Sequence, residues 1–160
     1  MSYIPMFEVL PEYNQPEFRS FTVLPVNNLG VPTGNYDIVE MFCNDEDCDC
    51  RRVILCIVDE KTEEAMAYIA YGWGSKDYYA SWATFGTTKK YSECGKHIKQ
   101  SVEVMYGIHL NGMSSQSKYA PQFLSYIEAM LSEDKEYTNR IKKHYKLFRA
   151  EIDRQYSIEH

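Results

Sequence analysis

Long apolar runs are missing from this chain. No stretch approaches the roughly 20 consecutive apolar residues that a membrane-spanning helix needs, so we expect no integral membrane protein. Residues 1–18 contain Glu8 and Glu12 with three prolines, and they lack the basic segment and apolar run of a secretory signal. We therefore expect a soluble cytoplasmic protein.

Sequence signatures of the common enzyme classes are missing as well. The chain has no H-E-x-x-H, G-x-S-x-G, Walker loop, dinucleotide-binding glycine fingerprint or EF-hand loop, which favours a non-enzymatic protein. Positive charge is scarce: 17 Lys and Arg against 23 Asp and Glu give a net charge of -6, and that field repels nucleic acid. Aromatic residues make up 14% of the chain, so stacking on single-stranded nucleic acid stays as an alternative.

The composition is that of a globular domain. The chain has 160 residues, of which 44% are hydrophobic and 25% charged, and this length suits one domain with a substantial core. No internal repeat, low-complexity tract or linker divides it. We expect a single domain over residues 1–160.

The order of the predicted elements indicates the fold class. Apolar alternation or continuity predicts strands, helical spacing predicts helices, and residues 78–85 fit either. Prolines and glycines in the first 35 residues predict loops and short extended pieces without a helix, and His109 is expected in a loop. Strands before helices indicate an α+β fold, an antiparallel β-meander with a C-terminal helical layer on one of its faces. The predicted strands cover 19–26, 36–43, 52–58 and 65–73, and the predicted helices cover 92–106, 114–131 and 132–152.

Five cysteines are an odd number, which argues against a disulfide framework and for a reducing compartment. Cys43, Cys48 and Cys50 lie between two predicted strands, at the tip of a β-hairpin, so their thiols must be close. Neighbouring thiolates repel one another unless a cation neutralises them, and thiolate sulfur selects zinc over harder ions, with iron and copper(I) as further possibilities. The spacing predicts a metal site, with zinc as its ion.

A fourth ligand has to come from elsewhere in the chain or from solvent. Cys56 lies six strand residues beyond Cys50, nearly 20 Å away at about 3.3 Å per residue, so we assign it to the core. Cys94 and His97, at ligand-like spacing, are the main candidates, and Asp47 or Asp49 are others. A protein-supplied fourth ligand gives a closed structural site, whereas a bound water gives an open site suited to Lewis-acid chemistry.

Three other readings of the cysteines stay open. The acidic tip between Cys43 and Cys50 can be a solvated turn with unrelated thiols. Cys48 and Cys50 can form a redox dithiol, although one intervening residue strains the bond and no C-x-x-C helix start is present. Cys94 and His97 can act as nucleophile and base one helical turn apart.

One motif set resembles a known group of proteins. Residues 36–53, which end in Cys48-Asp-Cys50-Arg51-Arg52-Val53, together with Tyr71-Gly72-Trp73 and residues 116–120, resemble an uncharacterised family of small bacterial proteins that carry a Cys-Asp-Cys-Arg-Arg hairpin. That resemblance implies no known activity. The C-x-C element is also similar to the SEC-C metal-binding motif, but the second Cys or Cys-His pair of that motif does not follow.

Together these features favour a zinc-stabilised domain that acts as a binding or adaptor module for a protein or small-molecule ligand. A metal-dependent hydrolase with an open zinc position is the alternative from a different class. No feature of the sequence selects an oligomeric state.

Overall fold

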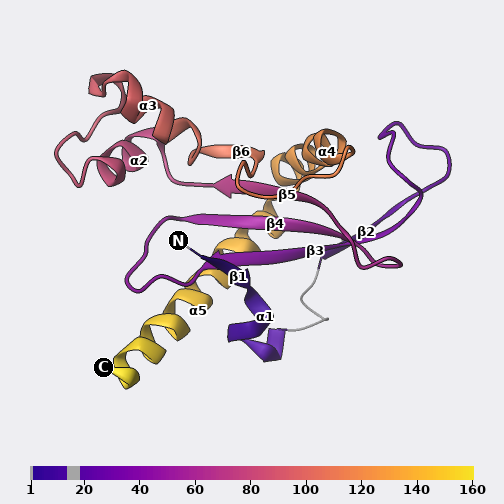
Figure 1. The fold of residues 1–160 in the computed structure, drawn as a ribbon, viewed down its shortest axis with the longest axis horizontal. Coiled ribbons are helices and arrows are strands. Elements are labelled where there is room, and N and C mark those ends of the chain that lie inside the picture. Colours follow the sequence, from indigo (N-terminus) through magenta and orange to yellow (C-terminus); the bar gives the residue numbers. More distant parts are fainter. Residues whose placement is uncertain (1, 14–18) are drawn as a thin grey trace.

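A computed structural model describes residues 2–13 and 19–160, which form an antiparallel sheet with helices packed against it (Figure 1). Within these residues the sheet has six strands. Their bounds are β1 Tyr3–Pro5, β2 Arg19–Val23, β3 Gly34–Cys43, β4 Arg52–Asp59, β5 Ala65–Gly72 and β6 Gly107–Leu110.

The centre of the sheet is the meander that the sequence predicts. β3, β4 and β5 pair in chain order, and β6 joins the edge at β5. On the other side of β3, β2 pairs with the first half of that strand and β1 with its last three residues. The register places Met41 opposite Ile54 and Ile54 opposite Ala70.

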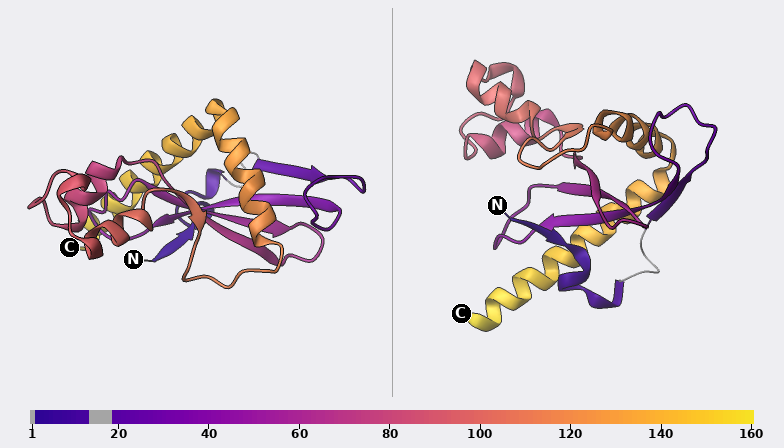
Figure 2. Two further views of the ribbon diagram at one scale, coloured as in Figure 1. Left: turned by 90° about the horizontal axis from the view of Figure 1, so that it is seen from above. Right: turned by 45° about the vertical axis from the view of Figure 1, so that its right-hand side comes forward.

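The helices follow mainly in the C-terminal half. α4 and α5, together with the short α1, pack on one face of the sheet (Figure 2). The predicted α+β class, with helices on one face of an antiparallel sheet, is confirmed. Among the described helices, none combines the length and apolar character required to cross a bilayer. The helical segments are α1 Met6–Val9, η1 Pro11–Tyr13, α2 Lys76–Ala83, η2 Tyr91–Glu93, α3 Lys96–Glu103, α4 Ala120–Glu133 and α5 Lys135–Glu159.

Strand alternation creates the main core. On β3, Tyr36, Ile38 and Phe42 are fully buried, and Glu40 shares their inward phase, while Asp37, Val39 and Met41 on the opposite phase are only partly buried. They meet the apolar stripes of α4 and α5, represented by Phe123 and Phe148. The two-residue period of the strands and the 3.6-residue period of the helices thus both direct apolar side chains into the space between the sheet and the helices, which is the main core.

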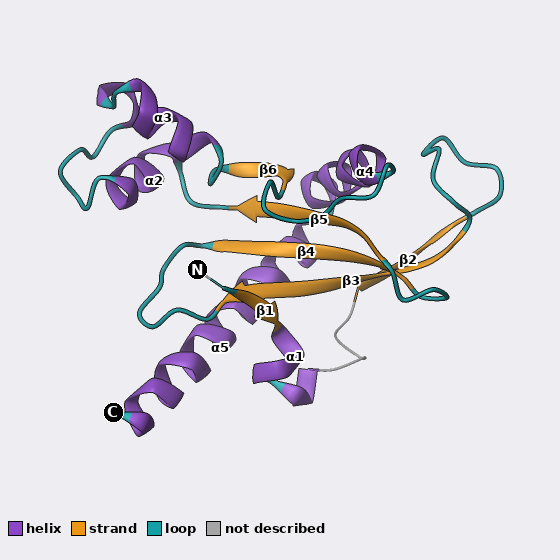
Figure 3. Cartoon of the chain, viewed as in Figure 1, coloured by secondary structure: helices purple, strands orange, loops and turns teal. Residues whose placement is uncertain are grey.

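A second, smaller core lies beside the end of β5, where α2 and α3 pack on each other (Figure 3). Gly72, the last residue of β5, lets this pair of helices approach the sheet. A Cβ at Gly72 would lie 2.0 Å from the backbone oxygen of Met105, so no larger residue fits without displacing the chain. Close backbone approach therefore explains this glycine.

Three local predictions are wrong, and one that the sequence left open is decided. The first 35 residues contain α1, because burial of Met6 and contact with α5 stabilise a single turn that the sequence alone would not. Residues 78–85, which the sequence left open between strand and helix, belong largely to α2. This helix starts after Ser75, whose hydroxyl accepts a hydrogen bond from the Tyr78 amide. His109 lies in β6, where pairing with β5 overrides a weak local signal.

The third correction concerns α4, which begins at Ala120 and not at residue 114. Residues 111–119 form a loop that Gln116 anchors to the sheet edge. Its side-chain oxygen accepts from the Tyr68 amide at 2.9 Å, and its side-chain nitrogen donates to the Tyr68 carbonyl at 2.9 Å. The side-chain amide of Gln116 thus makes the two hydrogen bonds with β5 that a neighbouring strand would make, at the point where β6 ends.

Candidate metal centre

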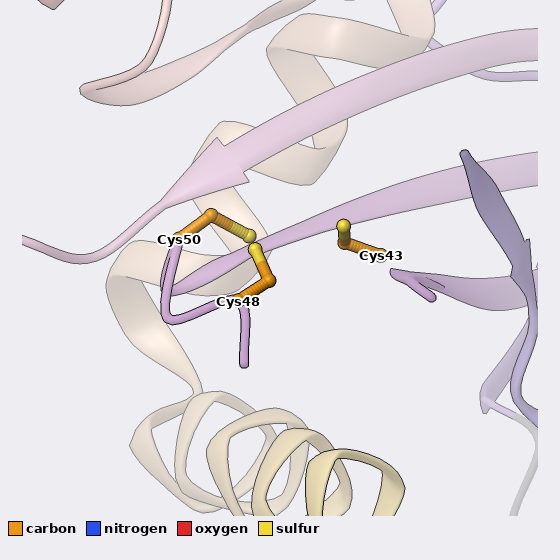
Figure 4. Close-up of side chains that lie close together, drawn as sticks. All are labelled: Cys43, Cys48 and Cys50. Atoms are coloured by element: carbon orange, nitrogen blue, oxygen red, sulfur yellow. The ribbon is translucent and has the colours of Figure 1, made fainter. Parts of the chain in front are cut away.

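The connection between β3 and β4 gathers three thiols. Cys43 ends β3, and Cys48 and Cys50 lie in the loop that leads to β4. Asp47 and Arg51 have positive φ angles of 53° and 51°, and these left-handed residues fold the loop back on itself. The three Sγ atoms lie within 4.8 Å of one another, and Figure 4 shows those of Cys48 and Cys50 turned toward each other beside Cys43. This cluster can hold a metal ion.

The cluster is largely shielded from water. Cys43 and Cys50 are fully buried, and Cys48 is partly exposed. Burial favours strong charge interactions between thiolates and a cation, because the local dielectric is low. The partial exposure of Cys48 leaves a route by which an ion can enter.

Backbone amides are arranged to support negative charge on the sulfurs. The amide of Asp45 donates to Sγ of Cys43 at 3.5 Å. For Cys48, the hydrogen bond with Cys43 and the backbone amide of Cys50 lower the pKa, but the hydrogen bond with the Cys50 thiol and burial raise it by more, so the pKa of Cys48 is raised overall. The amide of Arg52 adds to the hydrogen bonds from Cys43 and Cys48 that lower the pKa of Cys50. Each sulfur therefore accepts a hydrogen bond from the backbone amide two residues further along the chain. Such hydrogen bonds stabilise the thiolate form that binds a metal.

Without a cation, the three thiols compete for a single negative charge. Hydrogen bonds from Cys43 and then Cys48 lower the pKa of Cys50 to about 3, against the effect of burial. The pKa of Cys43 is raised by its hydrogen bonds to Cys48 and Cys50 and by burial. One thiolate with two thiol donors is the outcome, and a metal ion would take the place of those protons.

Helix α5 holds the loop from one side. Arg149 is almost fully buried, and its two terminal nitrogens donate at 2.6 Å to the carbonyls of Cys43 and Asp45. The hydroxyl of Tyr145 accepts from the Arg51 amide at 3.1 Å and donates to a carboxylate oxygen of Asp49 at 3.2 Å. These contacts fix the backbone on both flanks of the cluster.

Helix α2 holds the same loop from the other side. The buried Tyr79 hydroxyl donates to the carbonyls of Cys50 and Arg51 at 2.9 and 3.0 Å, and Tyr78 donates to the carbonyl of Asp49. The Arg51 guanidinium lies 3.9 Å from the Tyr78 ring centroid and pairs with Asp49 at 3.2 Å. The cysteine loop is thus clamped between two helices that are far apart in sequence.

A third neighbour is Tyr3 on β1, whose hydroxyl lies 3.7 Å from Sγ of Cys50. Arg52 donates from NH1 to this hydroxyl at 3.2 Å. Burial, followed by the charge of Cys50, raises the pKa of Tyr3. Tyr3 therefore stays a neutral phenol that links Arg52 to the sulfur cluster.

The other predicted ligands lie elsewhere. The cluster that the structure brings together in its described residues comprises Cys43, Cys48 and Cys50, without Cys94, His97, Asp47 or Asp49. Cys94 follows η2, where its thiol donates to the Lys90 carbonyl at 3.5 Å, and His97 lies in α3.

Cys56 lies in the middle of β4, buried and outside the cluster, as the strand spacing predicts. Burial raises the pKa of its thiol to about 11. A protonated, inert thiol is the expected state of this residue.

Sequence reasoning missed the residues that clamp the loop. Tyr145 belongs to the predicted apolar stripe of α5, and Arg149 lies one turn further along. Nothing in their local sequence pairs them with a cysteine loop about a hundred residues earlier. An arginine at position 149, beside the apolar stripe of α5, was the available signal, and the structure pairs it with Asp153 one turn further along.

No protein-family model matches the chain, and neither does any curated protein or solved structure. The fold and the site by themselves define the class: an α+β domain with a buried three-cysteine cluster able to hold a metal ion. The functional conclusion rests on the geometry of that cluster.

Proposed function

We propose that Cys43, Cys48 and Cys50 bind one zinc ion and that the chain is a non-enzymatic, metal-stabilised binding or adaptor module. The observation that carries the proposal is the convergence of three Sγ atoms within 4.8 Å. Zinc bonds to thiolate sulfur at about 2.3 Å, so sulfurs around one ion are separated by less than twice that distance. The three thiols need only a small contraction to surround it.

The surroundings support a thiophilic ion over a hard one. Calcium and magnesium take oxygen ligands, whereas thiolates select zinc, copper(I) or iron. Amides directed at the sulfurs favour the ionised ligands that such ions require. The fourth zinc ligand is a water, a side chain that moves on binding, or a group from a partner.

The role that fits these contacts is structural. A zinc ion would join the end of β3 to the loop that α2 and α5 clamp through Tyr79 and Arg149. Metal binding energy is folding energy where the site does not exist in the unfolded chain. The ion would therefore stabilise the end of the sheet where β3 and β4 are connected, together with both helical contacts.

A metal-dependent hydrolase is the second candidate, favoured by the three-residue size of the cluster. An open fourth position can hold a water for Lewis-acid chemistry. Three thiolates, however, donate more negative charge to zinc than histidines do, which weakens its ability to acidify a bound water. Hydrolysis of ester or phosphate substrates that depends on the bound metal would make the hydrolase the better description.

The test is metal analysis of the full chain purified without chelator. We expect one zinc per chain, lost in Cys48→Ser and in Cys50→Ser. Cys94→Ser and His97→Ala are matched controls. If either residue supplied the fourth ligand, its substitution would also weaken zinc binding. Cobalt substitution adds a count of thiolates, since each thiolate strengthens the sulfur-to-metal charge-transfer band. A folded protein that binds no zinc or other thiophilic ion would overturn the proposal.

A further inference from the structure

We propose that a cavity on the face of the sheet opposite α4 and α5 binds a small monocarboxylate with an apolar tail, with its carboxylate on Arg52. The cavity has a volume of about 360 Å³, within the lower range of ligand pockets. It goes beyond the proposed metal function, because none of the three cysteines lines it. Its lining residues are Tyr3, Met41, Arg52, Ile54, Tyr68, Asn111, Met113 and Ser114.

The long walls of the cavity are apolar. Met41 on β3 faces Ile54 on β4 as a direct cross-strand pair, and Tyr68 on β5 extends this wall. Met113, in the loop after β6, is 95% exposed and lies at the rim. Methionine side chains adapt to different apolar shapes, so two of them suit a flexible tail. Asn111 and Ser114 supply polar groups at the same rim.

The polar end of the cavity is Arg52, which has only 8% of its surface exposed. Its partners are neutral: NH1 donates to the Tyr3 hydroxyl at 3.2 Å and NH2 to the Val104 carbonyl at 3.3 Å. Its Nε is enclosed without a hydrogen-bond partner. Among residues 2–13 and 19–160, no carboxylate forms an ion pair with it.

A buried guanidinium without a counter-ion is costly, and a carboxylate is the group that matches its planar array of donors. Its neighbour Arg51 offers a direct contrast, because Arg51 already pairs with Asp49 at 3.2 Å. The positive charge of Arg52 is felt nearby: burial and then Arg52 lower the pKa of His109 on β6. The cavity thus combines a cationic end with an apolar body.

The ligand chemistry follows from this asymmetry. A carboxylate near Arg52 would let the tail run over Met41 and Ile54 toward the loop of Met113. A chain of about eight carbons, or an aryl group of similar size, suits a cavity of this volume. Octanoate is the probe that represents the class, and 1-octanol has the same tail without the charge.

The experiment is titration of the full chain with octanoate and, separately, with 1-octanol. Calorimetry measures the affinity, and methyl NMR locates the binding site. We expect octanoate to shift the methyl signals of Met41, Ile54 and Met113, and to leave those of Met6 and Met130, on the helix-covered face, unchanged. Octanol should bind at least about tenfold more weakly, because the charge-assisted hydrogen bonds are lost.

Variants complete the test. Arg52→Met should weaken octanoate binding about tenfold or more, whereas the matched Arg51→Met should bind like the parent. Met41→Trp should abolish binding by filling the cavity. Equal affinity for octanol and octanoate, unchanged binding by folded Arg52→Met, or no methyl shifts in the parent would overturn the proposal. If Arg52→Met does not fold, the parent's methyl shifts and the octanol comparison decide.

The outcome is separable from that of the metal proposal. Octanoate should bind Cys48→Ser as it binds the parent, because the cysteines do not line the cavity. Loss of metal with retained octanoate binding would remove only the proposed metal function. Retained metal without octanoate binding would remove only this ligand site.

Discussion

The carboxylate of Glu40 on β3 lies 2.9 Å from Nδ1 of His144 on α5, and both side chains are buried. Glu40 occupies the inward phase of its strand, between Ile38 and Phe42. His144 is fully buried in the stripe that α5 turns toward the sheet. A polar pair thus joins strand and helix inside an otherwise apolar layer.

Removing one partner of this pair should strongly destabilise the fold. Glu40→Ala leaves His144 buried beside an unfilled site, so we expect a loss of about 3–5 kcal/mol in the free energy of unfolding. Urea denaturation measures it. Asp37→Ala, on the same strand with its hydrogen bond at the exposed surface, is the control and should cost less than about 1 kcal/mol. Equal losses in the two variants would contradict a structural role for the pair.

Arg149 should matter for the metal site although it contacts no thiol. Arg149→Met removes two hydrogen bonds to carbonyls in the cysteine loop, and each buried acceptor left unpaired costs about 1–3 kcal/mol. We expect lower stability and weaker zinc binding, measured by urea denaturation and by competition with a chelator. Arg154→Met, which loses only an exposed pair with Glu151, should leave zinc affinity unchanged. Parent-like zinc affinity in Arg149→Met would show that the loop does not need this clamp.

His109 should make stability depend on pH. Burial and then Arg52 hold the pKa of His109 below its ordinary value of 6.5, so the folded state releases a proton that the unfolded chain keeps. Its contribution is therefore complete above pH 6.5 and falls as the pH drops toward the folded pKa. We expect parent stability to decline more than that of His109→Gln between about pH 7 and pH 5.

NMR titration of the imidazole checks the cause directly. The signal of His109 should titrate below the ordinary histidine value of 6.5, and Arg52→Met should raise its midpoint. Parallel stability curves for parent and His109→Gln would contradict the assigned shift.

Phe85 should be replaceable with a gain in stability. It has a φ of 55° and is 96% exposed, so it has backbone strain without the benefit of burial. Asparagine tolerates this left-handed conformation, and we expect Phe85→Asn to stabilise the protein by about 0.5–1 kcal/mol. Thermal denaturation measures it, with Phe85→Ala as a control that keeps the strain. A loss of stability in Phe85→Asn would mean that the ring has a packing role.

Strand periodicity predicted the sheet well because it reports burial directly. The alternation of Tyr36, Ile38 and Phe42 places one face of β3 in the core, and the apolar run of β4 fits its burial on both faces. β1 and β6 were missed because they are short, three and four residues, and depend on pairing with a neighbouring edge.

The thiol cluster was predictable for a similar reason. Cys43, Cys48 and Cys50 are close in sequence and are flanked by two strands that must pair, so their convergence is a local property. Cys94 and His97 were assigned by ligand-like spacing alone. Spacing within a segment does not say which way that segment packs, and α3 packs on α2.

The sequence by itself determined the α+β class and the gathering of three thiols at one hairpin, because residue periodicity and short loop closure act over a few neighbouring residues. Only the tertiary structure decided that Arg149, Tyr145 and Tyr79 clamp this loop, and that Arg52 lies buried at the end of a cavity without an acidic partner among the described residues. Contacts between residues far apart in the chain depend on how whole layers pack, and no local pattern records that choice.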